Sequence, residues 1–226
     1  MVALTSVAAL AVSTALVART QDQTAVALNV SGKAPAGAVV LLDGSPDAAA
    51  KNFYKRYTKQ PSGWKLGKEG YSNDKVDITS RQEFGDAYLH AEWRTPLTGD
   101  GNAGIAFQGR YEIQIFDNFG TTADKHGVAA LYDQTPAKIN ASKKRGEWQT
   151  FDIYFRAPRF DAAGKVTEPA RATVIHNGVV VHNNASFTGP TGIQYGEYKG
   201  EAPLGPIVLQ GDHGNVEFRN VWVLPL

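Results

Sequence analysis

A carboxylate and a carboxamide lie two residues apart near the middle of the chain, in a stretch where polar and apolar residues alternate. Glu112 and Gln114 alternate with Tyr111, Ile113 and Ile115. A period of two places the polar pair on one face of a strand and the apolar residues on the other, which no amphipathic helix does. A carboxylate of tuned pKa can act as a general base or acid, and a carboxamide holds hydroxyl groups by directional hydrogen bonds. We expect Glu112 and Gln114 to lie at the centre of a polar site.

Asp117 and His213 complete the candidate catalytic set with Glu112. In a regular strand Asp117 would point away from Glu112, so the two acids can share a site only if a bulge near Phe116 adds one residue. Paired carboxylates serve as nucleophile and acid in retaining glycosidases, but here an amide, Gln114, stands between the acids, and that mechanism is not assumed. Asp117 and His213 also stand in sequences typical of turns, so a structural role is the alternative for both.

A second group of side chains is expected to hold a polar ligand. Its members are Asn102, Arg110, Gln114, Tyr132, Trp148 and Gln210. The amides would bind hydroxyl groups, and the two aromatic residues border loops, where a ring can stack on a sugar. Core packing is the alternative for Tyr132 and Trp148. For Asn102, which follows Gly101, the alternative is a left-handed backbone position.

Charge and composition limit the partners. The chain has 226 residues, with 23 basic and 22 acidic side chains and a net charge of +1, so no global field favours nucleic acid or an anionic membrane. Because the chain has no cysteine, disulfides, thiol nucleophiles and thiolate zinc sites are excluded. Histidine spacing predicts no dedicated transition-metal site, although oxygen-rich loops could hold a divalent metal such as calcium. A neutral partner is the natural expectation, and the oligomeric state is left open.

The elements that must position these residues are short strands. Apolar runs and turn residues predict one short helix within 45–60 and strands at 39–42, 64–66, 77–79, 88–94, 104–108, 109–116, 151–155, 172–175, 179–181, 207–210 and 216–223. Gly109 predicts a hairpin or a bent strand around it, and Asn177-Gly178 is the strongest hairpin signal. The long non-periodic region 118–147 is expected to border the site. Glu92 and Arg94 share one strand face and are expected to form cross-strand ion pairs.

This pattern predicts the fold class and the domain organisation. Many short strands joined by glycine-rich turns indicate an all-β protein, a sandwich of two antiparallel sheets, with one domain over residues 28–226. Residues 1–18 are apolar, small and uncharged, which is typical of the hydrophobic region of a secretory signal. A short membrane anchor or a buried helix is the alternative. We expect residues 1–27 to be a signal peptide and N-terminal tail, and the protein to be secreted or periplasmic, without stable membrane insertion after cleavage.

Several motifs, in this order along the chain, resemble the 3-keto-disaccharide hydrolase domain family. The blocks are Glu83-Phe84-Gly85-Asp86, Glu92-Trp93-Arg94, Gly101-Asn102-Ala103-Gly104-Ile105, Gly109 to Asp117, Gly146-Glu147-Trp148-Gln149-Thr150, His176-Asn177-Gly178, Leu209 to Asn215 and Phe218-Arg219-Asn220. The resemblance implies a concanavalin-like jelly roll and an exported bacterial enzyme that cleaves glycosides whose sugar was first oxidised at C3.

For such a sugar, the three candidate catalytic residues would have different roles. The ketone acidifies the C2 hydrogen, so Glu112 is the candidate base, and Asp117 and His213 are candidate proton donors or metal ligands. Two alternatives stay open. One is a carbohydrate-binding module without catalysis, since this fold also supports lectins, and the other is a hydrolase of unoxidised glycosides.

Overall fold

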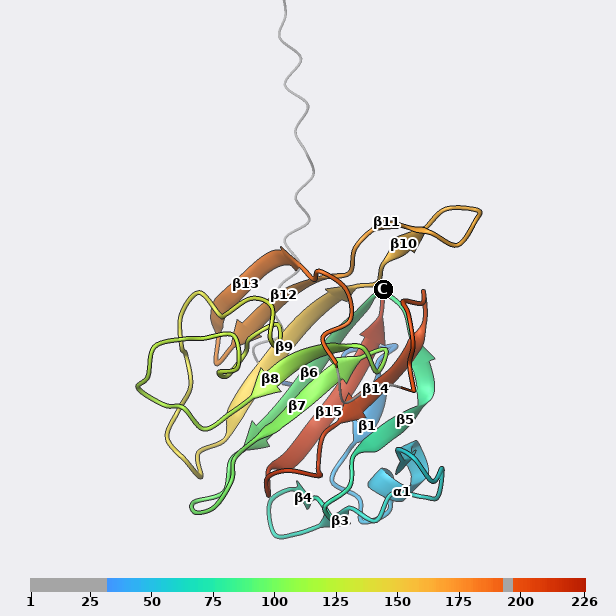
Figure 1. The fold of residues 1–226 in the computed structure, drawn as a ribbon. Helices are drawn as coiled ribbons and strands as arrows, with labels where there is room; N and C mark the ends of the chain where they lie inside the picture. The colour runs from blue at the N-terminus through green and yellow to red at the C-terminus, as the bar shows by residue number, and fades with distance from the viewer. Residues whose placement is uncertain (1–31, 193–196) are drawn as a thin grey trace, which may run out of the picture.

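The computed structural model describes residues 32–192 and 197–226, in which two antiparallel sheets pack face to face (Figure 1). The larger sheet has the order β13 (Val179–Ser186), β12 (Arg171–His176), β9 (Gln149–Arg156), β6 (Ala87–Arg94), β15 (Glu217–Pro225), β4 (Tyr71–Ser72) and β3 (Lys65–Leu66), and β1 (Val39–Leu42) also pairs with β15. The smaller sheet has the order β2 (Phe53–Lys55), β5 (Ile78–Phe84), β14 (Gly205–Leu209), β7 (Ala103–Phe107) and β8 (Tyr111–Ile115). The predicted all-β sandwich of the jelly-roll kind is confirmed.

Two small elements lie outside these sheets. The helix α1 (Ala48–Asn52) confirms the short helix predicted within 45–60, and it ends where the chain enters strand β2. The hairpin of β10 (Arg159–Phe160) and β11 (Val166–Glu168) projects from one end of the sandwich (Figure 1). Among the described residues, no helix has the length and apolar character needed to cross a membrane. The predicted signal, residues 1–27, lies outside the described residues.

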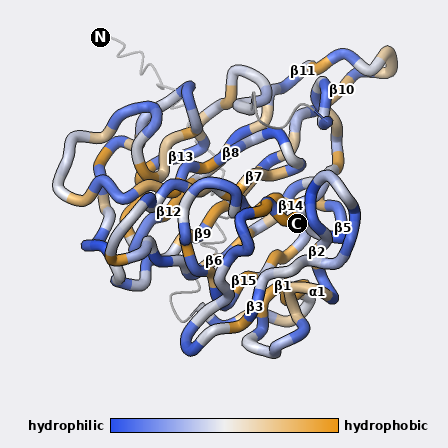
Figure 2. Tube along the Cα trace, turned by 60° about the horizontal axis from the view of Figure 1, so that its bottom comes forward, coloured by the Kyte–Doolittle hydropathy of each residue, from blue (hydrophilic) through white to orange (hydrophobic). Residues whose placement is uncertain are grey.

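Period-two alternation builds the core between the sheets. In β6, Leu89, Ala91 and Trp93 point inward, and in β8 Ile113 and Ile115 do the same. Figure 2 shows apolar stretches along the strands and mostly hydrophilic connecting loops. Because alternate residues of each strand point away from this core, both sheets also have an outer face that is free to carry polar groups.

Strands β7 and β8 form the hairpin that carries the central motif. Their register is regular from Ala103 opposite Ile115 to Phe107 opposite Tyr111. The N–H of Arg110 donates to the Phe107 carbonyl at 2.9 Å and closes the turn, whose two central residues, Gln108 and Gly109, both have positive φ, 55° and 63°. The hairpin alternative is therefore correct, and the bent strand is not.

The loop that follows β8 turns back and covers its free edge. Within 127–133, the N–H of Ala129 donates to the Gln114 carbonyl at 2.8 Å, and the N–H of Tyr132 donates to the Glu112 carbonyl at 3.1 Å. The N–H of Gln114 in turn donates to the Ala130 carbonyl at 3.0 Å. An exposed strand edge is thus protected, and the region expected to border the site does lie against β8.

The outer face of the larger sheet carries an ordered set of charges. The side chain of Arg219 donates to Glu92 at 2.7 Å, and Arg94 donates to Glu217, so both expected residues of β6 form ion pairs across to β15. Asn220 lies at a bulge of β15 with φ of 46°.

Candidate active site

Glu112 lies on the outer face of the smaller sheet, with its side chain folded over the neighbouring strand. A Cβ atom placed on Gly104 would come within 2.4 Å of the Glu112 Oε1 atom. Glycine at this position therefore leaves the space that the carboxylate occupies. Glu112 is only 1% exposed, so it is not a solvated residue on a strand surface. A buried carboxylate on the outer face of a sheet is unusual unless the protein uses it.

Gln114 lies beside Glu112 and is held by its amide nitrogen. Nε2 donates to Asn102 Oδ1 at 3.1 Å and to the His126 carbonyl at 3.3 Å. The Oε1 atom of Gln114 is buried and has no hydrogen-bond partner within the described residues. Since buried polar atoms are nearly always paired, this oxygen is suited to accept a hydrogen bond from a ligand hydroxyl.

Gln210 and His213 approach the same region from the end of β14. The N–H of Gln210 donates to the Gly104 carbonyl at 3.0 Å. Gln210 is only 2% exposed, and its side chain has no hydrogen-bond partner within the described ranges. Further along, the N–H of Gly214 donates to the Asn102 carbonyl at 2.9 Å. The loop that carries His213 is thereby fixed beside Asn102. The His213 side chain is exposed, and its Nε2 atom lies 3.6 Å from Asp212 Oδ1.

Tyr132 lies beside Glu112 on the covering loop. Its ring contacts that of His126, with centroids 5.4 Å apart. Burial, followed by the nearby charge of Glu112, raises the pKa of the Tyr132 hydroxyl. The phenol therefore keeps its proton at neutral pH and can donate it in a hydrogen bond.

Arg110 lies next to this group, but its guanidinium is hydrogen-bonded to carbonyl groups of the protein itself. Its Nε donates to the Gly200 carbonyl at 2.6 Å, and its Nη1 donates to the Gln108 carbonyl at 2.6 Å. The guanidinium also lies over the ring of Tyr198, 5.4 Å from the centroid. These contacts make Arg110 a residue that fixes the segment around Gly200 against the sheet.

Asp117 is not brought to Glu112. The β7–β8 register continues without a bulge, since Asp117 lies beside Gly101, where the regular pairing would place it. Asp117 lies two residues beyond the end of β8, and in an extended chain five residue steps separate the two acids by roughly 16 Å. Asp117 forms an ion pair with Arg145. Burial raises the pKa of the Asp117 carboxyl, and the opposite charge of Arg145 only partly offsets this.

Trp148 lies on the other sheet. The guanidinium carbons of Arg94 and Arg219 are 4.8 Å and 3.9 Å from its ring centroids. Both arginines belong to the outer face of the larger sheet, so Trp148 does not face Glu112. Its position in the sequence, just before a core strand, gave no indication of the sheet to which it belongs.

Two contributors to the site were not predicted. Gly104 supplies the space for the Glu112 carboxylate, as described above. Thr191 accepts a hydrogen bond from the Glu112 N–H at 3.0 Å and donates one to the Arg110 carbonyl at 3.0 Å. No local signal could reveal Thr191, because it is distant from β8 in the sequence. Within the described residues, no three carboxylate or imidazole groups gather to hold a metal, and a divalent metal stays a prediction.

Known proteins resemble the chain in sequence and in fold. A family model described as the 3-keto-alpha-glucoside-1,2-lyase-like domain matches residues 37–224. A solved structure of a candidate glycosyl hydrolase from Parabacteroides distasonis is 32% identical, with a TM-score of 0.76, over 87% of this chain and 88% of that one. No curated protein matches the chain.

Two more candidate glycosyl hydrolases from the same organism have a similar fold. One is 15% identical with a TM-score of 0.61, over 84% of this chain and 94% of its own. The other is 19% identical with a TM-score of 0.59, over 84% of this chain and 99% of its own. At these identities the likeness establishes the shared fold only.

Proposed function

Because the chain belongs to the family of 3-keto-alpha-glucoside-1,2-lyase-like domains, we propose that it cleaves glycosides whose sugar ring carries a ketone at C3. The reaction takes place on the outer face of the smaller sheet. The observation that carries this proposal is the buried carboxylate of Glu112 on the sheet face that also carries Gln114, whose Oε1 atom has no hydrogen-bond partner within the described residues. A base next to unused hydrogen-bonding groups is the arrangement needed to take a proton from a held sugar.

The chemistry begins at C2 of the sugar. The C3 ketone makes the C2 hydrogen acidic, and Glu112 removes it as a proton. The electron pair of the C2–H bond becomes a C1–C2 double bond while the C1–O bond breaks and its electrons leave with the oxygen. That oxygen then takes a proton and departs as an alcohol. Addition of water to the unsaturated sugar would make the overall result hydrolysis.

The surrounding side chains would orient the sugar and supply protons. Gln114 and Gln210 hold hydroxyl groups, and Asn102 fixes the Gln114 amide. Tyr132 keeps its phenol proton beside Glu112 and can donate to the leaving oxygen. His213 is a second candidate donor at the rim. In this proposal Asp117, paired with Arg145, takes no direct part.

The substrate proposal is tested by comparing a glucosyl disaccharide with its 3-keto form, each with and without a chelator. We expect the 3-keto form to be cleaved at least about a hundredfold faster, because only it has an acidified C2 hydrogen. Equal cleavage of both forms would instead indicate a hydrolase of ordinary glycosides. Binding without product would indicate a carbohydrate-binding module, and loss of activity with chelator would reveal a metal requirement.

Export is part of the proposal and rests on the composition of residues 1–27 alone. Comparison of the N-terminus of the protein recovered outside the cytoplasm with that of the full chain tests it directly.

Gly104 gives a test of Glu112 that leaves the carboxylate in the chain. In Gly104→Ala the new methyl group would collide with Glu112 Oε1, so the carboxylate must move. We expect kcat on the 3-keto-disaccharide to fall about tenfold to a hundredfold, since small displacements of a catalytic group are costly. Gly67→Ala is the control for a glycine replacement away from the site, because Gly67 has no positive φ and the nearest atom to the added Cβ is the Gly70 carbonyl oxygen at 3.3 Å. Unchanged kcat in Gly104→Ala would contradict the role of Glu112.

A further inference from the structure

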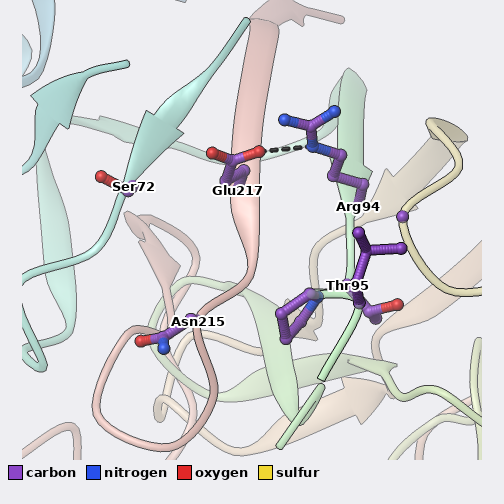
Figure 3. A pocket seen from close by; sticks show the side chains of 8 residues that line it. Ser72, Arg94, Thr95, Asn215 and Glu217 are labelled. Carbon is purple, nitrogen blue, oxygen red and sulfur yellow. Dashed lines mark hydrogen bonds and ion pairs between the residues drawn. The ribbon is translucent and has the colours of Figure 1, made fainter. Parts of the chain in front are cut away.

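A cavity of about 390 Å³ lies at the end of the sandwich where β6 and β15 approach β4 (Figure 3). Its lining includes Ser72, Arg94, Pro96, Leu97, Asn215 and Glu217. The volume falls in the range of small-molecule sites. None of these residues belongs to the group around Glu112.

The lining combines unused polar groups with exposed apolar surface. Ser72 and Asn215 are exposed, and within the described ranges neither side chain has a hydrogen-bond partner. Leu97 is 76% exposed beside Pro96. A pyranose ring presents hydroxyl groups at its edge and C–H groups on its faces. A hydroxyl and an amide beside an apolar ledge match that surface.

The charges around the cavity favour a neutral ligand. Arg94 forms ion pairs with both Glu69 and Glu217, and the neighbouring Arg219 is paired with Glu92. Both arginines are therefore held by carboxylates of the protein. Neither is left to bind the acidic group of a uronate or sulfated sugar, so the arginines of the cavity do not favour an anionic ligand.

The cavity is connected to the Glu112 site by one short loop. Gln210, at the start of the loop, hydrogen-bonds to Gly104, and Gly214 hydrogen-bonds to Asn102, which holds Gln114. The next residue, Asn215, lines the cavity. The chain from Gln210 to Asn215 spans at most about 18 Å. Because Arg94 and Glu217 in the cavity wall belong to the larger sheet, an oligosaccharide that reaches both sites passes around this end of the sandwich.

From this continuity we propose that the cavity is a distal subsite for a neutral glycosyl unit of a substrate longer than a disaccharide. The proposal rests on the proposed function of the Glu112 site. It adds a preference for chain length, which the Glu112 site alone does not give. Asn215 and Ser72 hold hydroxyl groups of the distal unit, and Leu97 contacts its C–H face.

The test measures binding by calorimetry, with neutral gluco-oligosaccharides of two to five residues and a five-residue chain that ends in a uronate. Binding does not require turnover, so this result is independent of the 3-keto chemistry. We expect the Kd of the neutral chains to fall about fivefold or more once their length reaches the cavity, as one or two added hydrogen bonds would give. The uronate chain should bind more weakly than its neutral counterpart.

Two variants locate the effect in the cavity. Asn215→Ala and Leu97→Ser should each raise the Kd of the long chains about threefold to tenfold and so flatten the dependence on length. Ile139→Ser, at a residue with a similar exposure of 55% outside the cavity, is the matched control and should keep that dependence. Long chains that bind no better than a disaccharide, or variants that shift all lengths equally, would overturn the subsite. A thermal melt of each variant confirms folding before its Kd is used.

Discussion

Glu112→Gln is expected to lower kcat on a 3-keto-disaccharide by about a thousandfold and to leave the fold intact. The amide has the same shape and fits the space over Gly104, but it cannot take a proton from C2. A positioned general base contributes about 10² to 10⁴ in rate. KM should change much less than kcat, because the sugar is held by the neighbouring amides.

The measurement is steady-state turnover by the purified variant, with a thermal melt to confirm folding. Glu83→Gln is the matched control, because Glu83 is an exposed carboxylate on the same sheet. We expect full activity in that control. Wild-type activity in Glu112→Gln would remove Glu112 from the mechanism, and equal losses in both variants would point to an effect unrelated to the base.

Local patterns predicted the features that depend on nearest neighbours. Alternation alone placed Glu112 and Gln114 on the face opposite Ile113 and Ile115, because successive side chains of a strand point to opposite faces. Asn177-Gly178 forms its hairpin with φ of 50° and 81°, as the turn demands.

Features that depend on strand pairing could not be predicted from local sequence patterns. Trp148 was expected near the ligand, but the pairing of β9 with β6 carries it to the larger sheet. Arg110 was expected to bind substrate, but the segment around Gly200 returns to occupy it. In both cases the deciding contacts join residues far apart in sequence, and periodicity carries no information about them.

Tertiary contacts determine where the short helix predicted within 45–60 ends. Its alanines and lysines favour a helix, and Ala48–Asn52 is helical. From Phe53 the chain pairs with β5, and the Phe53 side chain is completely buried in the core. Burial of one aromatic side chain outweighs the small helix propensities of the residues that follow.

The second large effect is expected in stability, and it originates at His90 on the outer face of the larger sheet. His90 is 2% exposed, and its Nδ1 lies 2.8 Å from Asp152 Oδ1. Its Nε2 lies 3.9 Å from Glu92. Its ring is stacked on Trp222, whose Nε1 donates to the Gly32 carbonyl. Burial alone would lower the pKa of His90, but the hydrogen bond and charges of the two carboxylates outweigh it and raise the pKa to about 9.

This shift gives stability a definite dependence on pH. In the unfolded chain the pKa of histidine is about 6.5, so the folded state holds this proton more tightly. The stabilisation, about 3 kcal/mol, is fully present below pH 6.5 and is lost as the pH rises through about 9. Hydrogen bonding from His90, and then from Asn220 and Arg219, outweighs burial and lowers the pKa of Glu92 to about 2. That carboxylate contributes above its unfolded pKa of about 4.5 and stops contributing only as the pH falls towards 2.

His90→Gln should therefore lower the free energy of unfolding by about 3 kcal/mol at pH 6, and most of this difference should disappear by pH 9.5. Denaturant titrations at pH 6, 7.5 and 9.5 measure it. His126→Gln is the matched control, because His126 pairs with Asp133 in an exposed position, where an ion pair contributes little. A wild-type stability that is flat from pH 6 to 9.5, or a variant that keeps the wild-type slope, would contradict a buried imidazolium at His90.

The segment before β1 should also respond to this substitution, because the side chains of Trp222 and Asn220 hydrogen-bond to the Gly32 carbonyl. Loss of the imidazolium should loosen this segment, and proteolysis at pH 6 can detect the change as faster cleavage near residue 32.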